Sequence, residues 1–93
     1  MPVWDAGAGE LRYRGQVVKR FRNAGSNQRC VLDAFQRLGW PRHILDPLPA
    51  NRGINSKQRL HDTIKNLNRC HESECLIFYG LDAGHAVGWR VLE

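Results

Sequence analysis

The stretch "SKQRLHDTIKNLNR", residues 56–69, contains the clearest periodic pattern in the chain. Leu60, Ile64 and Leu67 recur at i, i+4 and i+7, a spacing that places them on one side of a helix. The serine that opens the stretch is a suitable N-cap. The pattern therefore predicts an amphipathic helix over residues 57–69 whose apolar side packs on a core.

The opposite side of this helix is polar throughout. At about 100° per residue, it carries Gln58, Asp62, Lys65, Asn66 and Arg69, with Arg59 and His61 at its flanks. Such a surface suits nucleic acid, because its side chains can donate to phosphates and base edges. A helix face that is merely solvated has the same composition, so this pattern alone does not separate the two interpretations.

The residues after the helix predict a β-hairpin. Segments 75–79 ("CLIFY") and 86–91 ("AVGWRV") are rich in β-branched and aromatic side chains, and the link between them contains two glycines. The connector before the hairpin, "NRCHESEC" (68–75), offers three candidate zinc ligands but no paired knuckle. Its two cysteines also lack the C-x-x-C spacing of redox pairs. We interpret it as a polar connector and expect no metal and no cofactor.

The N-terminal half predicts a second hairpin and a helix. In "ELRYRGQVVKRF" (10–21), apolar and basic residues alternate on both sides of a Gly-Gln turn. Residues 1–9 show no period and are expected to form a loose lead-in, with Trp4 tethered to the core. Apolar spacing predicts a helix over Asn27–Leu38. Three prolines exclude a long helix over 41–49, where either one helical turn or a short strand fits.

Length and charge narrow the class of protein. Ninety-three residues with 42% hydrophobic and 25% charged side chains are typical of one globular domain. No apolar run is long enough to span a bilayer, so we expect a cytoplasmic protein without a membrane partner. The formal net charge of +5 favours a polyanionic partner, nucleic acid first.

Taken together, these segments resemble a winged helix-turn-helix domain, in particular the C-terminal DNA-binding domains of response-regulator transcription factors. "RLHDTIKNLNR" (59–69) stands where the recognition helix of that family stands, and "LIFYGLDAGHAVGWRV" (76–91) resembles its wing. Gly88-Trp89-Arg90 matches the Gly-Tyr-Arg signature that ends the wing. The resemblance implies one winged-helix-like α+β domain over residues 10–92. Its parts are an N-terminal β-hairpin, two main helices with a short or broken element between them, and a C-terminal wing.

The resemblance implies a duplex DNA-binding module, a transcriptional regulator that reads DNA with helix 57–69 and the wing. The residues implied are Arg59, His61, Lys65, Asn66, Arg69 and Arg90. In this role Asn66 would pair with adenine and Arg69 with guanine. The chain departs from the family in two places: the second helix is replaced by the proline-broken region, and the wing turn carries Asp82 and His85 instead of Arg or Lys.

Two other classes of function are alternatives to DNA binding: a protein–protein module and an enzyme. A winged helix can serve as a protein–protein module or homodimer, which an apolar patch around Trp40, Ile44, Leu45 and Leu48 would favour. The basic residues of the N-terminal hairpin are expected to form a separate exposed patch that contacts a phosphate, contacts a protein or is only solvated. They are Arg12, Arg14, Lys19, Arg20 and Arg22. An enzyme with a small-molecule substrate is not expected. The sequence has no Gly-rich phosphate loop, no catalytic triad spacing and no paired carboxylates.

Overall fold

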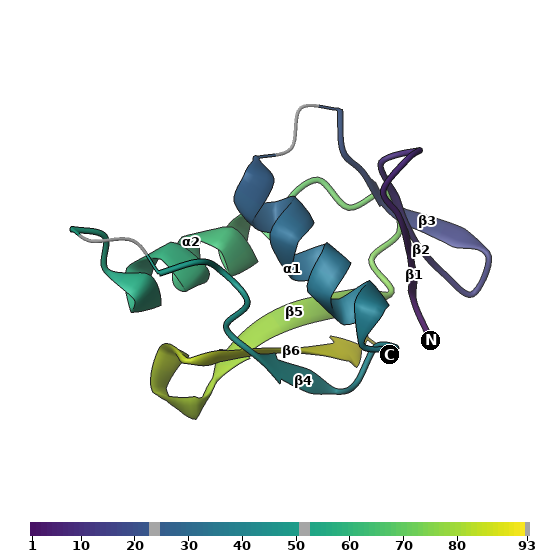
Figure 1. Ribbon diagram of the computed structural model, residues 1–93. Coiled ribbons are helices and arrows are strands. Elements are labelled where there is room, and N and C mark those ends of the chain that lie inside the picture. The colour runs from purple at the N-terminus through teal and green to yellow at the C-terminus, as the bar shows by residue number, and fades with distance from the viewer. Residues whose placement is uncertain (23–24, 51–52, 93) are drawn as a thin grey trace.

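The computed structural model describes residues 1–22, 25–50 and 53–92. Its elements, labelled in Figure 1, are β1 (Val3–Asp5), β2 (Glu10–Tyr13), β3 (Gln16–Arg20), α1 (Ser26–Arg37), β4 (His43–Leu45), α2 (Ser56–Leu67), β5 (Leu76–Leu81), the single 3₁₀ turn η1 (Asp82–Gly84) and β6 (Ala86–Val91). The strands form two antiparallel sheets, in the orders β1-β2-β3 and β4-β6-β5. This α+β arrangement is winged-helix-like, which confirms the predicted fold class. Neither α1 nor α2 has the length and apolar composition of a membrane-spanning helix.

The N-terminal segment 1–9 is not the loose lead-in that the sequence predicts. It contains β1, which pairs with β2 in the register Trp4↔Leu11 and adds a third strand to the hairpin. Trp4 is 4% exposed, and its indole Nε1 donates to Asp33 Oδ1 on α1 at 2.7 Å. Its backbone nitrogen donates to Gln36 Oε1 at 2.8 Å. The expected tether between Trp4 and the core is therefore confirmed, and it runs through α1.

Both helices begin one residue earlier than predicted. Helix α1 starts at Ser26 after Gly25 and ends at Arg37. Leu38, the last residue of the predicted helix, is 58% exposed and so does not belong to the apolar stripe. Helix α2 starts at Ser56, with the Asn55 side chain accepting from Gln58 N at 3.1 Å. Asn55 is thus the N-cap in place of the predicted serine, because its side chain reaches the free N–H of the first turn.

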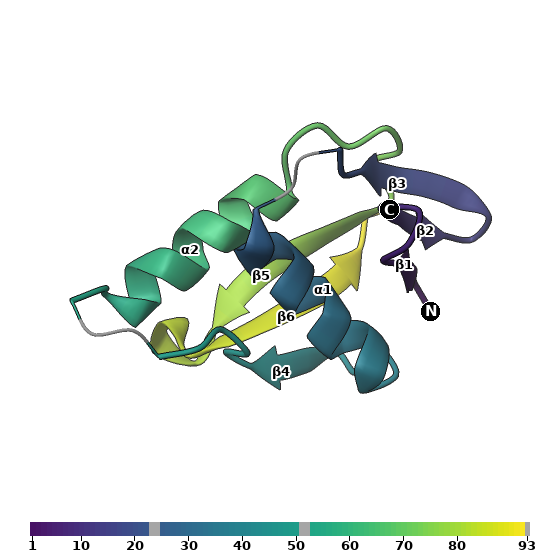
Figure 2. The same cartoon turned by 45° about the horizontal axis from the view of Figure 1, so that its top comes forward.

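The region between the helices contains a short strand, β4, which is one of the two alternatives that the sequence predicts. β4 pairs with β6 in the register Ile44↔Val87 and becomes an edge of the second sheet. Figure 2 shows β4 beside β6, with α1 and α2 both on one side of this sheet. No helix lies between α1 and α2 in the described residues 38–50 and 53–55, so the structure there offers no second helix for a helix-turn-helix. Residues 51 and 52 lie outside the described residues.

Aromatic rings fill the space between the helices and the second sheet. Phe35 of α1 stacks on Trp40 with ring centroids 5.0 Å apart, and Trp40 meets Trp89 of β6 edge to face at 6.0 Å. Phe78 of β5 completes the group at 6.0 Å from Phe35. All four rings are at most 5% exposed. This packing explains why Trp40 is a core residue although it follows the end of α1.

The edge of the second sheet at β5 is closed by one side chain. Asn68, the residue after α2, donates through Nδ2 to Phe78 O and accepts through Oδ1 from Phe78 N, both at 2.9 Å. The amide therefore takes the place of a neighbouring strand, and it fixes the end of α2 against β5.

Asn68→Ala is expected to lower the free energy of unfolding by about 2 kcal/mol, since it removes two hydrogen bonds and leaves both backbone groups of Phe78 without partners. Asn68→Asp is the matched control. It keeps the acceptor, loses the donor and is expected to cost less than the alanine variant. Urea unfolding of the three proteins gives the comparison. Equal stability of wild type and Asn68→Ala would show that this pair does not support the edge.

Candidate nucleic-acid interface

Helix α2 buries one side and exposes the other, as its sequence pattern predicts. Leu60, Ile64 and Leu67 are at most 9% exposed. Ile64 lies against β5, where its Cδ1 is 3.6 Å from the position that a Cβ on Gly80 would occupy. The side chains exposed to solvent along α2 and just after it are Lys57, Gln58, His61, Asp62, Lys65 and Arg69.

The predicted site residues of α2 divide into three groups. Lys65 is exposed on α2, whereas Arg69 is exposed two residues beyond Leu67, where the helix ends earlier than the predicted residue 69. These two positions are called the exposed crest of α2 below. His61 is exposed on the side that faces the turn between β5 and β6, where it lines a hollow with Leu81 and Gly84. Arg59 and Asn66 are only half-exposed and face the opposite way, toward α1. The helix therefore presents polar groups in three directions: along its crest, toward the turn between β5 and β6, and toward α1.

Arg90, the sixth predicted site residue, lies elsewhere. It pairs with Ile77 of β5 in the sheet register, and its neighbour Trp89 points into the core. Because side chains alternate along a strand, Arg90 projects from the face of the sheet opposite α2. It is also close to the C-terminal end of β6, whereas the tip of the wing lies at the other end of that strand. The structure does not bring Arg90 together with the residues of α2.

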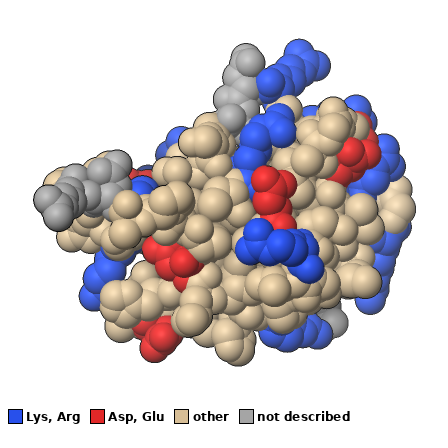
Figure 3. Space-filling view, in the orientation of Figure 1, with Lys and Arg blue, Asp and Glu red and all other residues tan. Residues whose placement is uncertain are grey.

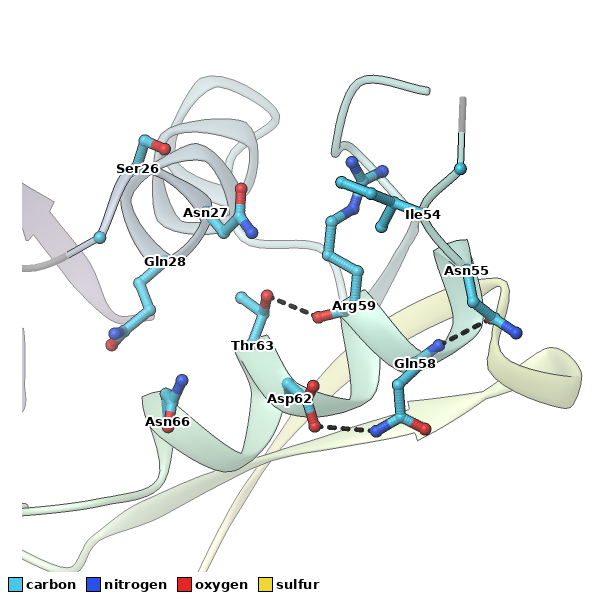
Figure 4. Close-up of a pocket in the computed structure, with 12 residues that line it drawn as sticks. Ser26, Asn27, Gln28, Ile54, Asn55, Gln58, Arg59, Asp62, Thr63 and Asn66 are labelled. Atoms are coloured by element: carbon cyan, nitrogen blue, oxygen red, sulfur yellow. Dashed lines mark hydrogen bonds between the residues drawn. The ribbon is translucent and has the colours of Figure 1, made fainter. Parts of the chain in front are cut away.

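An open groove of about 630 Å³ separates the start of α1 from α2. Figure 4 shows Ser26, Asn27 and Gln28 of α1 facing Thr63 and Asn66 of α2 across it. Two of the groups in the groove are already engaged, since Gln58 Nε2 donates to Asp62 Oδ1 at 2.9 Å and Thr63 Oγ1 donates to Arg59 O at 2.8 Å. Two more are engaged as well, since Gln28 Oε1 accepts from Lys19 Nζ at 3.3 Å and Asn55 Oδ1 accepts from Gln58 N at 3.1 Å. The amides of Asn27 and Asn66 add polar groups to the lining of the groove.

Arg59 extends from α2 along this groove toward Ile54 (Figure 4). Its Nε is buried and has no hydrogen-bond partner among the described residues. A buried donor without a partner costs free energy, so a nearby acceptor would be bound favourably. Because this Nε is itself buried, a ligand on the surface can reach Arg59 only through the part of the side chain that lines the groove.

The basic residues of the two halves differ in their ion pairs. In the N-terminal sheet, Arg12 and Arg20 contact Glu10 at 2.8 Å and 3.1 Å, and Arg20 also contacts Glu72 at 2.8 Å. Within the described residues, no carboxylate lies within ion-pair distance of the basic side chains of α2 or of Arg69. On the face in Figure 3, Lys and Arg alternate with Asp and Glu and form no continuous basic surface. Within the described residues, the basic side chains of α2 and Arg69 are therefore uncompensated, as are Arg37 and Arg42 elsewhere on the surface.

The tip of the wing folds back on the start of α2. Atoms of the Lys57 side chain lie 3.2–3.4 Å from the position that a Cβ on Gly84 would occupy, so a side chain at Gly84 would crowd Lys57. Gly84 has a φ of +89° and directly follows Asp82 and Ala83, which also have positive φ. The turn holds Asp82 and His85 at the surface, while Lys57 supplies the nearest basic group.

Lys19 of β3 was expected to join the exposed basic patch of the hairpin, and that prediction is wrong. A β-bulge leaves Val18 as an extra residue of β3, and both Val18 and Lys19 turn inward. Lys19 is 8% exposed; its Nζ donates to Asn66 O and, at 3.3 Å, to Gln28 Oε1. It therefore joins the N-terminal sheet to the last turn of α2. The signal was present, since alternation places Lys19 on the same face as Phe21.

Burial lowers the pKa of Lys19 below its ordinary value of 10.5; the neighbouring Cys70 raises it and Arg69 lowers it further. Between the lowered pKa and 10.5, the unfolded chain binds more protons than the folded chain. Below that window Lys19 is charged and its burial destabilises the fold. The free energy of unfolding therefore rises with pH across the window, because this cost is lost as Lys19 gives up its proton. We expect the stability of wild type relative to Lys19→Met to increase from neutral pH to pH 10.5 in urea unfolding. Parallel pH profiles would show that Lys19 carries no buried charge.

The connector 68–75 makes structural contacts along its length. Glu72 N donates to Val18 O at 2.7 Å, and His71 Nε2 lies 2.7 Å from Leu67 O at the end of α2. Cys70 is exposed and Cys75 is half-buried against the core. No three His, Cys, Asp or Glu side chains gather as a metal site within the described residues. The connector thus joins α2 to β5 and to the N-terminal sheet.

No family model, curated protein or solved structure matches this chain. The functional argument therefore depends on the geometry and charge of α2 and its surroundings.

Proposed function

We propose that the chain is a duplex DNA-binding module that lays the exposed side of α2 in the major groove. The observation that supports this most is the uncompensated positive charge of α2, in contrast to the paired arginines of the N-terminal sheet. A Lys or Arg without a carboxylate partner is available to neutralise a DNA phosphate, and the release of the counterions condensed on that phosphate favours binding.

The geometry suggests a division of roles. Lys65 and Arg69 on the crest would contact phosphates or guanine edges, since Arg can bond to guanine through two donors. Arg59 and Asn66 on the groove side would reach the sugar-phosphate backbone or an adenine edge. Lys57, held under the wing tip, would contact a phosphate on the other flank. Arg90 takes no part in this proposal. Such a module suits a transcriptional regulator in the cytoplasm and performs no catalytic step.

Salt dependence of DNA binding tests this proposal. The 93-residue chain is titrated into a fluorescein-labelled, mixed-sequence duplex at several salt concentrations, with fluorescence anisotropy as the readout. With phosphate contacts from Lys57, Arg59, Lys65 and Arg69, log K is expected to fall with log salt at a slope of about −3 to −4. Absence of binding at low salt by a chain shown to be folded would refute the proposal.

A further inference from the structure

We propose that the free edge of β4 is a docking site for an extended acidic peptide, which adds a strand to the second sheet. This inference is independent of DNA binding, because β4 lies on the far side of the β4-β6-β5 sheet from β5, the strand that α2 contacts. Figures 1 and 2 both show β4 as the outermost strand, with no other labelled element along its outer side.

The hydrogen-bond register leaves two residues of β4 with unused backbone groups. Trp89 N donates to Arg42 O, and Asp46 N donates to His85 O, so Ile44 bonds to β6 between them. His43 and Leu45 are the intervening residues, and their N–H and C=O groups point away from β6. Within the described residues, no hydrogen bond engages these outward groups. They form the template that strand addition requires.

An apolar hollow borders this edge. It is lined by Ala34, Arg37, Leu38, Pro41, His43, Ile44, Leu45 and Pro47. Leu38 is 58% exposed and Leu45 is 73% exposed, whereas Trp40, Ile44 and Leu48 of the predicted patch are at most 7% exposed. The predicted patch is therefore wrong for all but Leu45, and the second exposed apolar side chain, Leu38, was not part of it. Figure 3 shows mostly uncharged side chains over β4.

The charges around the edge identify the occupant as acidic. Arg37 lines the hollow and Arg42 directly precedes β4, and both are exposed without an ion pair among the described residues. The carboxylate nearest in sequence, Asp46, accepts from Leu48 N at 2.9 Å. An extended segment that alternates apolar and acidic side chains fits this edge. Its apolar side chains would pack on the exposed leucines, its acidic side chains would pair with the arginines, and its backbone would bond to the outward groups of β4.

The test uses a fluorescein-labelled, acetylated and amidated hexapeptide of alternating glutamate and leucine, with anisotropy as the readout. We expect saturable binding, and at least about tenfold weaker binding of two control peptides, a loss of roughly 1.4 kcal/mol. In one control lysine replaces glutamate. In the other, alternate backbone nitrogens are methylated, which removes ladder donors. Equal binding of all three peptides, or no binding of the acidic peptide, would overturn the proposal.

Variants of the protein locate the peptide. Leu45→Pro removes an outward N–H that β6 does not use and is expected to abolish binding. Arg37→Glu is expected to weaken binding about tenfold. Arg22→Glu, the same charge change before the start of α1 instead of at its end, is expected to leave binding unchanged. Unaltered binding in Arg37→Glu would place the peptide elsewhere and overturn the proposal. A wild-type dimer in light scattering that Leu45→Pro converts to monomer, without peptide binding, would overturn it in favour of self-pairing.

Discussion

Phe35→Ala is expected to lower the free energy of unfolding by about 3–5 kcal/mol. Phe35 is 0% exposed, and its ring centroid lies 5.0 Å from that of Trp40 and 6.0 Å from that of Phe78. Alanine would therefore leave a cavity that these rings cannot close. A domain of this length has a total stability of about 5–14 kcal/mol. The variant therefore loses a large share of it, and the midpoint of urea unfolding records the loss.

Phe35→Leu is the matched control, because leucine keeps most of the apolar volume; we expect it to cost about 1–2 kcal/mol. A Phe35→Ala cost below about 1 kcal/mol would mean that the site collapses freely. The aromatic group of Phe35, Trp40, Phe78 and Trp89 would then not be the centre of the core.

Lys65→Glu combined with Arg69→Glu is expected to weaken binding to duplex DNA at least about 100-fold at low salt, or roughly 2.8 kcal/mol. Each substitution removes a cation from the exposed crest of α2 and adds a charge that phosphate repels. The salt dependence should also become shallower, by about two units of slope for two lost phosphate contacts. Anisotropy titrations at several salt concentrations measure both effects.

Arg14→Glu combined with Arg90→Glu is the control with the same change in net charge. Arg14 lies in the turn between β2 and β3, far from α2 in Figure 1, and Arg90 projects from the opposite face of the second sheet. We expect the control to bind DNA within about threefold of wild type, since distant surface charges are screened. Equal losses in both variants would indicate that net charge, and not the face of α2, determines binding.

The elements with a strong apolar period were predictable from the sequence. Leu60, Ile64 and Leu67 indicate α2 because a stripe at this spacing has no other regular structure to bury it. The β-branched and aromatic runs at 75–79 and 86–91 likewise correspond to β5 and β6. The exposure of Lys65 on α2 follows from the same period, whereas Arg69 lies beyond the end of the helix at Leu67, a boundary that the period does not mark.

Features that depend on distant partners were not predictable. β1 is three residues long, and it forms because Trp4 meets Asp33 and Gln36 on α1, far along the chain. Alternation with Phe21 signals the inward turn of Lys19, but the bulge that turns Val18 inward as well has no local signal. The position of Arg90 follows from the register of β5 and β6, since a strand's period shows which residues share a face but not which element covers it.

Amide chemical-shift mapping of the nitrogen-15-labelled chain during titration with duplex DNA is the measurement that shows whether the exposed side of α2 binds the DNA. We expect the largest shift changes on the exposed side of α2, around Lys65 and Arg69, and at Lys57 beneath the wing tip. The amides of β2 and β3, whose arginines are paired with carboxylates, should change little. Changes confined to β2 and β3, or to the sheet face that carries Arg90, would contradict the account.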